Sequence, residues 1–147
     1  MSEEKNILPK AVIVDIDGTI ASRNERSPYD MTRVVEDAPV PQIIQLVKIL
    51  AENGYKIIFV SGRTEDGRQE TDRWFMYHMP ESIDTSILYM RKVGDNRNDA
   101  VVKKEIYLEH IHDKYDVLLT IDDRDRVVSM WRTELGLTCL QVNYGNF

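Results

Sequence analysis

The chain has 147 residues, of which 42% are hydrophobic and 30% are charged. That length and composition predict one globular domain over residues 1–147, with a polar tail at residues 1–9, and argue against disorder. No apolar run is long enough to cross a membrane, and the acidic opening is unlike a signal sequence, so we expect a cytoplasmic protein. The formal net charge of −6 argues against non-specific coating of nucleic acid but permits a local basic pocket.

Short apolar runs rich in β-branched residues alternate with helical patterns along the chain. The predicted strands are Ala11–Asp15, Lys56–Ser61, Ile87–Met90, Val117–Ile121 and Leu137–Val142. The predicted helices are one that begins at Pro41 and ends before Gly54, then Glu70–Met79, Asp99–Ile111 with Asn98 as its cap, and Arg124–Leu135. The segment Gly18–Ala38 is polar and irregular, and Cys139 is interpreted as a small core residue. This alternation predicts an α/β fold in which helices cover both faces of a parallel sheet, with ligands at the carboxyl ends of its strands.

The strongest motif is the run Asp15-Ile16-Asp17-Gly18-Thr19, directly after the first strand. Two carboxylates so close together would repel each other unless a cation or phosphoryl chemistry requires both. Asp15 can attack phosphorus to give an aspartyl phosphate, while Asp17 can protonate the leaving oxygen and later activate water. Thr19 either holds Asp17 by a hydrogen bond or starts the next turn. The alternative interpretation is an ordinary acidic turn.

Two further motifs supply groups that bind phosphate. Ser61-Gly62-Arg63 follows the second strand, where a hydroxyl, backbone amides and a guanidinium can surround the phosphoryl oxygens. Lys103, near the start of a predicted helix, can neutralise charge on the phosphoryl group. Asp99 lies one turn earlier, at the spacing of an ion pair with Lys103. The alternatives are an ordinary turn after a strand and a solvated helix lysine.

The fourth motif is Asp122-Asp123-Arg124, after another buried strand. A second pair of carboxylates at the same edge of the sheet would complete an oxygen-rich site for Mg²⁺, which prefers carboxylates, carbonyls, water and substrate phosphate. The alternative is a helix cap, and Asp123 could serve as that cap while Asp122 binds the metal.

In this order, the four motifs resemble those of the haloacid dehalogenase (HAD) superfamily. The resemblance implies a three-layer Rossmann-like sheet, with Asp15 as the nucleophile and Asp17 as the acid and base. It also implies that Ser61 and Lys103 bind phosphate. Mg²⁺ would be held by Asp15, by the backbone carbonyl of Asp17 and by Asp122.

A narrower resemblance is to the 3′-phosphatase domain of the polynucleotide kinase-phosphatases of T-even phages. The segments that carry this likeness are Pro28–Asp30, Val93–Asp99, Val101–Lys103, Ile121–Arg124, Met130–Arg132, Gln141–Val142 and Gly145–Phe147. It implies that Arg26, Arg63, Asp99 and Asp123 join the residues that bind substrate. It also suggests self-association at most, and a location in the host cytoplasm if the chain is phage-encoded.

The resemblance does not extend to kinase chemistry in this chain. Gly62 and Gly67 have the glycine spacing of a phosphate-cradling loop, but Arg68-Gln69 follow in place of Lys and Ser or Thr. We therefore expect no 5′-kinase activity from these residues.

The spacing of the motifs also bears on the substrate. Residues 18–38 and 64–83 leave room only for short lids, so no large cap domain is expected and the mouth of the site should be open. An open mouth suits a DNA or RNA end. Together with the resemblance, which implies the 3′ end, this leads us to expect a 3′-phosphatase, with 2′,3′-cyclic phosphate as a further substrate. The alternatives are a phosphatase acting on nucleotides or sugar phosphates, and an interaction module without activity.

Overall fold

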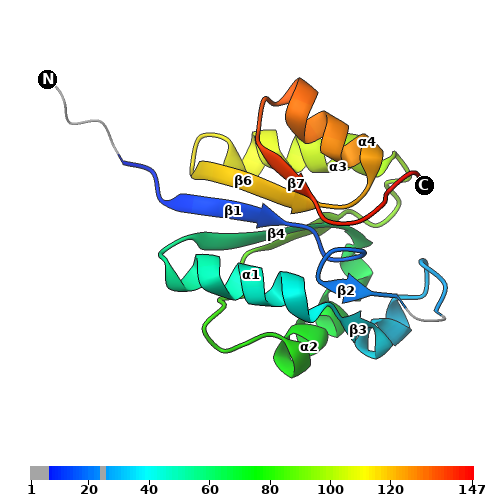
Figure 1. The fold of residues 1–147 in the computed structure, drawn as a ribbon. Coiled ribbons are helices and arrows are strands. Elements are labelled where there is room, and N and C mark those ends of the chain that lie inside the picture. Colours follow the sequence, from blue (N-terminus) through cyan, green and yellow to red (C-terminus); the bar gives the residue numbers. More distant parts are fainter. Residues whose placement is uncertain (1–6, 24–25) are drawn as a thin grey trace, which may run out of the picture.

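A computed structural model describes residues 7–23 and 26–147. A five-stranded sheet runs through its centre in the order β5-β4-β1-β6-β7, and all of its neighbouring strands are parallel (Figure 1). The strands are β1 (Lys10–Val14), β4 (Lys56–Thr64), β5 (Leu88–Arg91), β6 (Asp116–Asp122) and β7 (Cys139–Gln141). The parallel α/β fold predicted from the sequence is therefore confirmed. Of the predicted tail, residues 1–6 lie outside the described part of the chain.

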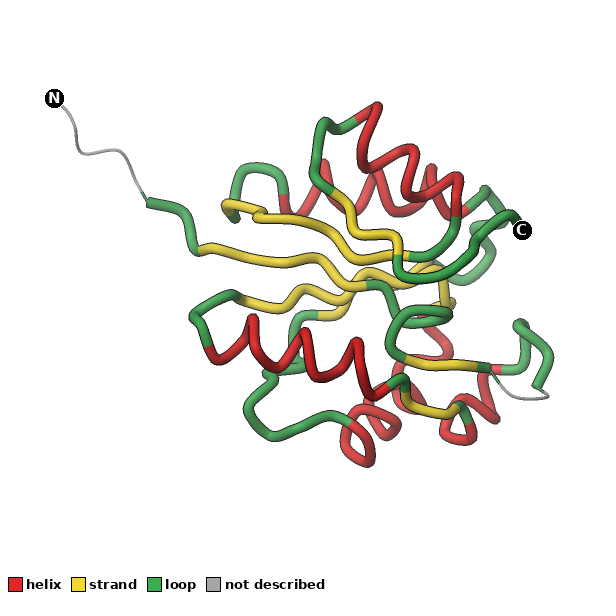
Figure 2. Tube along the Cα trace, in the orientation of Figure 1, coloured by secondary structure: helices red, strands yellow, loops and turns green. Residues whose placement is uncertain are grey.

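Helices cover both faces of this sheet and make the molecule three-layered (Figures 1 and 2). On one face lie α1 (Pro41–Glu52) and α2 (Arg68–His78), and on the other lie α3 (Asp99–Ile106) and α4 (Asp125–Ser129). The last two continue into short π-helical turns, Tyr107–Ile111 and Met130–Glu134. As predicted, Asn98 caps α3, where its side chain accepts a hydrogen bond from the Val101 N–H.

Burial on both faces explains why the central strands have continuous apolar sequences. In β1, Val12 and Val14 pack into the core beneath α1 and α2, whereas Ala11 and Ile13 pack into the core beneath α3 and α4. Successive side chains of a strand point to opposite faces, so each face of this strand needs its own apolar residues. Cys139 is buried in the second of these cores, as expected.

The segment predicted to be irregular contains a small lid. β2 (Ala21–Ser22) pairs antiparallel with β3 (Ala38–Pro39), and the 3₁₀ helix η1 (Met31–Glu36) lies between them and packs beside α2. A second 3₁₀ turn, η2 (Glu65–Gly67), precedes α2. The prediction missed these elements because each is too short to show a hydrophobic period. Its expectation of no large cap domain is confirmed. None of the helices in the described residues is long and apolar enough to cross a bilayer.

Candidate active site

The carboxyl ends of β1 and β6 bring the first and fourth sequence motifs together. These strands are neighbours, with Val14 opposite Ile121, and the Asp15 N–H donates to the Ile121 carbonyl at 3.0 Å. As a result, Asp15 and Asp122 lie side by side at the same edge of the sheet. Together with Asp123 they form a buried group in which one carboxylate oxygen from each residue lies within 4.8 Å of the others. We call Asp15, Asp122 and Asp123 the carboxylate cluster.

Lys103 is the cation of this cluster. Its Nζ donates to Asp15 Oδ1 at 2.7 Å and to Asp122 Oδ2 at 2.9 Å, and the residue is only 2% exposed. It is therefore not the solvated helix lysine of the alternative interpretation. The expected ion pair between Asp99 and Lys103 is wrong: Asp99 pairs instead with Arg91 and with Arg124 Nη1, the latter at 2.8 Å.

The turn after β1 is shaped by the cluster. Gly18 has a φ of +84°, and a Cβ atom built at this position would lie 2.0 Å from Asp123 Oδ2, so only glycine fits here. Thr19 Oγ1 donates to Asp15 Oδ2 at 2.9 Å, so of its two predicted roles the hydrogen bond to Asp17 is wrong. The alternative role of Asp123 as a helix cap is also wrong, because α4 has Arg124 at its N-cap and Asp123 is buried against Asp15 and Asp122.

The carboxylate cluster carries more negative charge than its lysine can balance. Burial and the charge of Asp122 raise the pKa of Asp15 well above its usual range, although Lys103 opposes this rise. The same two causes raise the pKa of Asp123. Burial acts to lower the pKa of Lys103, but the charges of Asp122 and Asp15 outweigh it and raise that pKa. Several buried carboxylate oxygens with excess negative charge are the donor set that suits a hard divalent cation such as Mg²⁺.

A second group of charged side chains surrounds Asp17, and in it two acids are matched by two arginines. Asp17 accepts from Arg63 Nε at 3.0 Å and Nη2 at 2.8 Å, and from Arg26 Nη2 at 3.3 Å. Asp37 accepts from Arg26 Nε and Nη2, both at 2.8 Å, and from Arg63 Nη2 at 3.0 Å. Asp17, Arg26, Asp37 and Arg63 are called the arginine cluster below. Burial opposes it, but the charge and hydrogen bonds of Arg63 lower the pKa of Asp17.

Asp37 is the charged residue that the sequence did not reveal. Its side chain is fully buried, its backbone carbonyl accepts from Trp74 Nε1 at 2.8 Å, and Arg63 donates onward to Thr71 Oγ1 at 3.0 Å. Asp37 lies in the polar lid segment, where a single acid carries no motif. Only the fold places it against Arg26 and Arg63, which come from different elements.

The Ser61-Gly62-Arg63 motif lies within β4, which extends past the predicted strand end to Thr64. Ser61 is 1% exposed, and its Oγ accepts from the Arg63 N–H at 3.1 Å. The Gly62 carbonyl accepts from Arg91 Nε at 2.9 Å, and a Cβ atom on Gly62 would lie 2.7 Å from Asp99 Oδ1. Asp99 therefore packs against the Ser61-Gly62-Arg63 motif, whereas Lys103 donates to Asp15 and Asp122.

Comparison with known proteins decides the family. Residues 9–147 match the family model described as "Polynucleotide kinase PNKP phosphatase domain". The chain belongs to this family. It is therefore a HAD-type phosphatase domain and a phosphoric monoester hydrolase.

Individual relatives agree with this assignment. A protein of Autographa californica nuclear polyhedrosis virus, named "Putative bifunctional polynucleotide kinase/RNA ligase", is 36% identical over 126 residues, which cover 84% of this chain and 18% of that protein. A chain in the solved structure of the Pnkp1/Rnl/Hen1 RNA repair complex is 42% identical with a TM-score of 0.91, over 99% of this chain and 46% of that one. This chain thus spans about half of that solved relative and a smaller part of the viral one.

A more distant structure shares the fold. The class C acid phosphatase of Bacillus anthracis with tungstate bound has a TM-score of 0.68 and 15% identity, over 95% of this chain and 67% of that chain. The fold is therefore also found in an acid phosphatase of low sequence identity.

Proposed function

We propose that this chain is a Mg²⁺-dependent polynucleotide 3′-phosphatase that works through an aspartyl-phosphate intermediate. The observation that carries the proposal is the carboxylate cluster, in which Asp15 lies buried beside one lysine and two further acids at the open edge of the sheet. The family match and the relatives named for polynucleotide kinase and RNA repair support a polynucleotide end as the substrate. We further propose that residues 10–147 act as one catalytic domain.

The reaction has two displacements at phosphorus. In the first, an Asp15 carboxylate oxygen forms a bond to phosphorus while the bond from phosphorus to the 3′ oxygen breaks, and Asp17 gives that oxygen a proton. In the second, Asp17 takes a proton from water, the water oxygen bonds to phosphorus, and the bond to Asp15 breaks. The products are a 3′-hydroxyl and inorganic phosphate.

The surrounding groups bind and orient the phosphoryl group. Lys103 neutralises charge on its oxygens, and Ser61 with the backbone at Gly62 contacts it from β4. Mg²⁺ would be held by the carboxylates of Asp15 and Asp122 and by the Asp17 backbone carbonyl, and when bound it supplies positive charge against both the nucleophile and the phosphate.

The arginine cluster explains how Asp17 can act as an acid although its pKa is lowered in the free protein. Arg26 and Arg63 bind Asp17, and both guanidiniums also suit phosphate oxygens. A terminal phosphate that attracts these arginines weakens their pairing with Asp17, so the pKa of that carboxyl rises and it can hold the proton that the leaving oxygen needs. Asp17 is the most exposed of the four members of the cluster, with 39% of its side chain accessible.

The small lid and the chemistry of the product support this substrate class. A polynucleotide end can approach a site that is flanked by a short hairpin and one 3₁₀ helix without threading a closed chamber. A 3′-hydroxyl is what a ligase requires, which fits relatives named for RNA ligase and RNA repair. Use of 2′,3′-cyclic phosphate ends, self-association and a cytoplasmic location stay predictions.

The experiment is phosphate release from a 3′-phosphorylated oligonucleotide, with Mg²⁺ or EDTA, by the wild type and Asp15→Asn. A 5′-phosphorylated oligonucleotide and a 3′-mononucleotide serve as controls. We expect Mg²⁺-dependent release that favours the 3′-phosphorylated oligonucleotide and falls by at least about 10³-fold in Asp15→Asn. A preference for the mononucleotide would keep the mechanism and assign the enzyme to small molecules, and release from no substrate would refute the proposal.

A further inference from the structure

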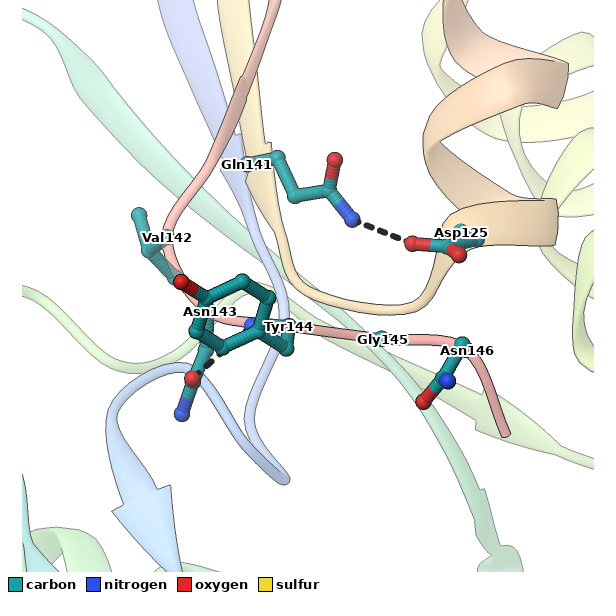
Figure 3. Close-up of a pocket in the computed structure, with 7 residues that line it drawn as sticks. All are labelled: Asp125, Gln141, Val142, Asn143, Tyr144, Gly145 and Asn146. Carbon is teal, nitrogen blue, oxygen red and sulfur yellow. Dashed lines mark hydrogen bonds between the residues drawn. The ribbon is translucent and has the colours of Figure 1, made fainter.

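A pocket of about 610 Å³ lies beside the carboxylate cluster and has no part in the chemistry proposed above (Figure 3). It is formed by Asp125, the first residue of α4, by Gln141, the last residue of β7, and by residues 142–146, which follow that strand. This volume falls within the range of about 300–1,000 Å³ that is typical of sites for small organic ligands. In Figure 3, Tyr144 and Asn143 lie at one end of the pocket, with Asp125 and Asn146 at the other.

The pocket is built against the carboxylate cluster by several short contacts. Gln141 Nε2 donates to the Asp123 carbonyl at 3.0 Å and to Asp125 Oδ1 at 2.7 Å. The Asp125 N–H donates to the Gly145 carbonyl at 2.7 Å, and a Cβ atom on Gly145 would lie 1.8 Å from the Asp123 carbonyl oxygen. Asp123 therefore belongs to the carboxylate cluster on one side and touches the pocket wall on the other.

The segment beyond the pocket is also tied to this region. The Arg124 guanidinium lies over the Phe147 ring at 4.6 Å from its centroid, and the same arginine pairs with Asp99. These contacts tie the chain end to α3, and the bond from Gln141 to the Asp123 carbonyl ties the pocket wall to the carboxylate cluster. A binding subsite needs such links if it is to position a reacting group.

The lining indicates what the pocket can bind. None of the described residues that line it is basic, and Asp125 adds a carboxylate, so a phosphate group would gain no charge stabilisation there. Gln141, Asn143 and Asn146 bring amide groups, which hydrogen-bond to the edges of heterocycles. Tyr144 is 95% exposed and therefore presents a free aromatic face for stacking. A neutral planar ring with polar edges fits this combination better than any anion.

We infer that this pocket binds the nucleobase of the terminal nucleotide, the one whose 3′-phosphate reacts at Asp15. Tyr144 stacks on the base and the amides meet its edges. The ribose then spans from the pocket past Asp123 to the carboxylate cluster. This inference rests on the proposed function, because it requires a nucleotide as the leaving group.

The test compares three variants on three substrates. Tyr144→Ala removes the ring, Tyr144→Phe keeps it, and Tyr77→Ala removes an exposed tyrosine of α2 that lies outside the pocket. The substrates are a 3′-phosphorylated oligonucleotide, the same oligonucleotide with an abasic terminal residue, and acetyl phosphate, which has no ring to stack on Tyr144. Loss of base stacking predicts that Tyr144→Ala raises KM for the normal oligonucleotide by about 5- to 100-fold, while Tyr144→Phe and Tyr77→Ala behave like the wild type.

The two other substrates separate a base subsite from a structural effect. The abasic end should have the same raised KM in the wild type and in Tyr144→Ala. Acetyl phosphate, which places no ring in the pocket, should be hydrolysed equally by all variants. If the wild type hydrolyses the oligonucleotide and Tyr144→Ala has an unchanged KM, or if the abasic end is bound as well as the normal one, the subsite is refuted and the proposed function stands. If the wild type hydrolyses only acetyl phosphate, the proposed function fails and the subsite with it.

Discussion

The two charged clusters at the carboxyl edge of the sheet differ in their balance. The carboxylate cluster has three acids and one lysine, so the pKa of Asp15 is raised, mainly by burial and then by Asp122. The arginine cluster has two acids and two arginines, and there Arg63 outweighs burial to lower the pKa of Asp17. Two aspartates that are two residues apart thus have shifts of opposite sign.

This difference predicts that a bound cation stabilises the carboxylate cluster and not the arginine cluster. A cluster with excess negative charge gains stability when a cation binds, whereas a balanced cluster gains none and loses stability when one member is removed. Opposite environments for two neighbouring carboxylates are also a common way in which enzymes separate the roles of nucleophile and acid. The following predictions test that difference.

The largest expected effect is from Asp37→Asn in the arginine cluster. This change keeps the shape of the side chain but leaves Arg26 and Arg63 buried with one acid fewer. Removing one partner from a buried ion pair costs about 3–5 kcal/mol, so we expect a loss of that size in the free energy of unfolding, measured with urea.

The matched control is Asp123→Asn in the carboxylate cluster, measured in EDTA. Because it removes charge from a site with an excess of it, we expect no loss, or a gain of up to about 1 kcal/mol. Equal losses in the two variants would break the comparison between the clusters.

The next prediction concerns pH and Arg63→Met. The lowered pKa of Asp17 means that its ionised form stabilises the folded protein above the usual Asp pKa of about 3.9, and that this contribution is lost as the pH falls through the lowered folded value. Without Arg63 that contribution shrinks. Urea unfolding from pH 5 down to pH 2 should therefore show a shallower acid loss in Arg63→Met than in the wild type, and an equal or steeper loss would contradict it.

A smaller effect is expected from the two buried tryptophans, each of which donates to one cluster. Trp131 Nε1 donates to Asp122 Oδ2 at 3.3 Å, and Trp74 Nε1 donates to the Asp37 carbonyl at 2.8 Å. Groups that orient metal ligands affect metal affinity by about 10- to 100-fold. We expect Trp131→Phe to raise the Mg²⁺ concentration for half-maximal activity by about tenfold and Trp74→Phe to leave it unchanged. The reverse pattern would place the metal at the arginine cluster and contradict the account.

Much of the fold and of the carboxylate cluster could be predicted from the sequence. The strands that carry Asp15 and Asp122 are buried on both faces, so their apolar runs are conspicuous and their ends are marked by acids. Parallel strands bring such ends to one edge of the sheet, where Lys103 donates to both Asp15 and Asp122.

The partners of individual side chains, including those of the arginine cluster, could be predicted only in part, because they depend on orientation that no local pattern encodes. A hydrogen bond from Thr19 to Asp17 was one of two predicted roles for Thr19, but after the turn at Gly18 its hydroxyl donates to Asp15. Asp99 and Lys103 have ion-pair spacing, yet the packing of α3 buries the lysine and leaves the acid to two arginines. Asp37 was missed because a lone acid in a polar lid has no signature before the fold is known.

The most direct test of the account is the melting temperature of the wild type and Asp15→Asn, each in EDTA and in Mg²⁺. Since the pKa of Asp15 is raised in the folded state, its ionised form costs stability above the usual Asp pKa, and asparagine removes that cost. We predict that Asp15→Asn melts roughly 2–4 °C higher than the wild type in EDTA, and that Mg²⁺ raises the melting temperature of the wild type more than that of the variant. A lower melting temperature for Asp15→Asn in EDTA, or no effect of Mg²⁺ on the wild type, would contradict the claim that the carboxylate cluster awaits a cation.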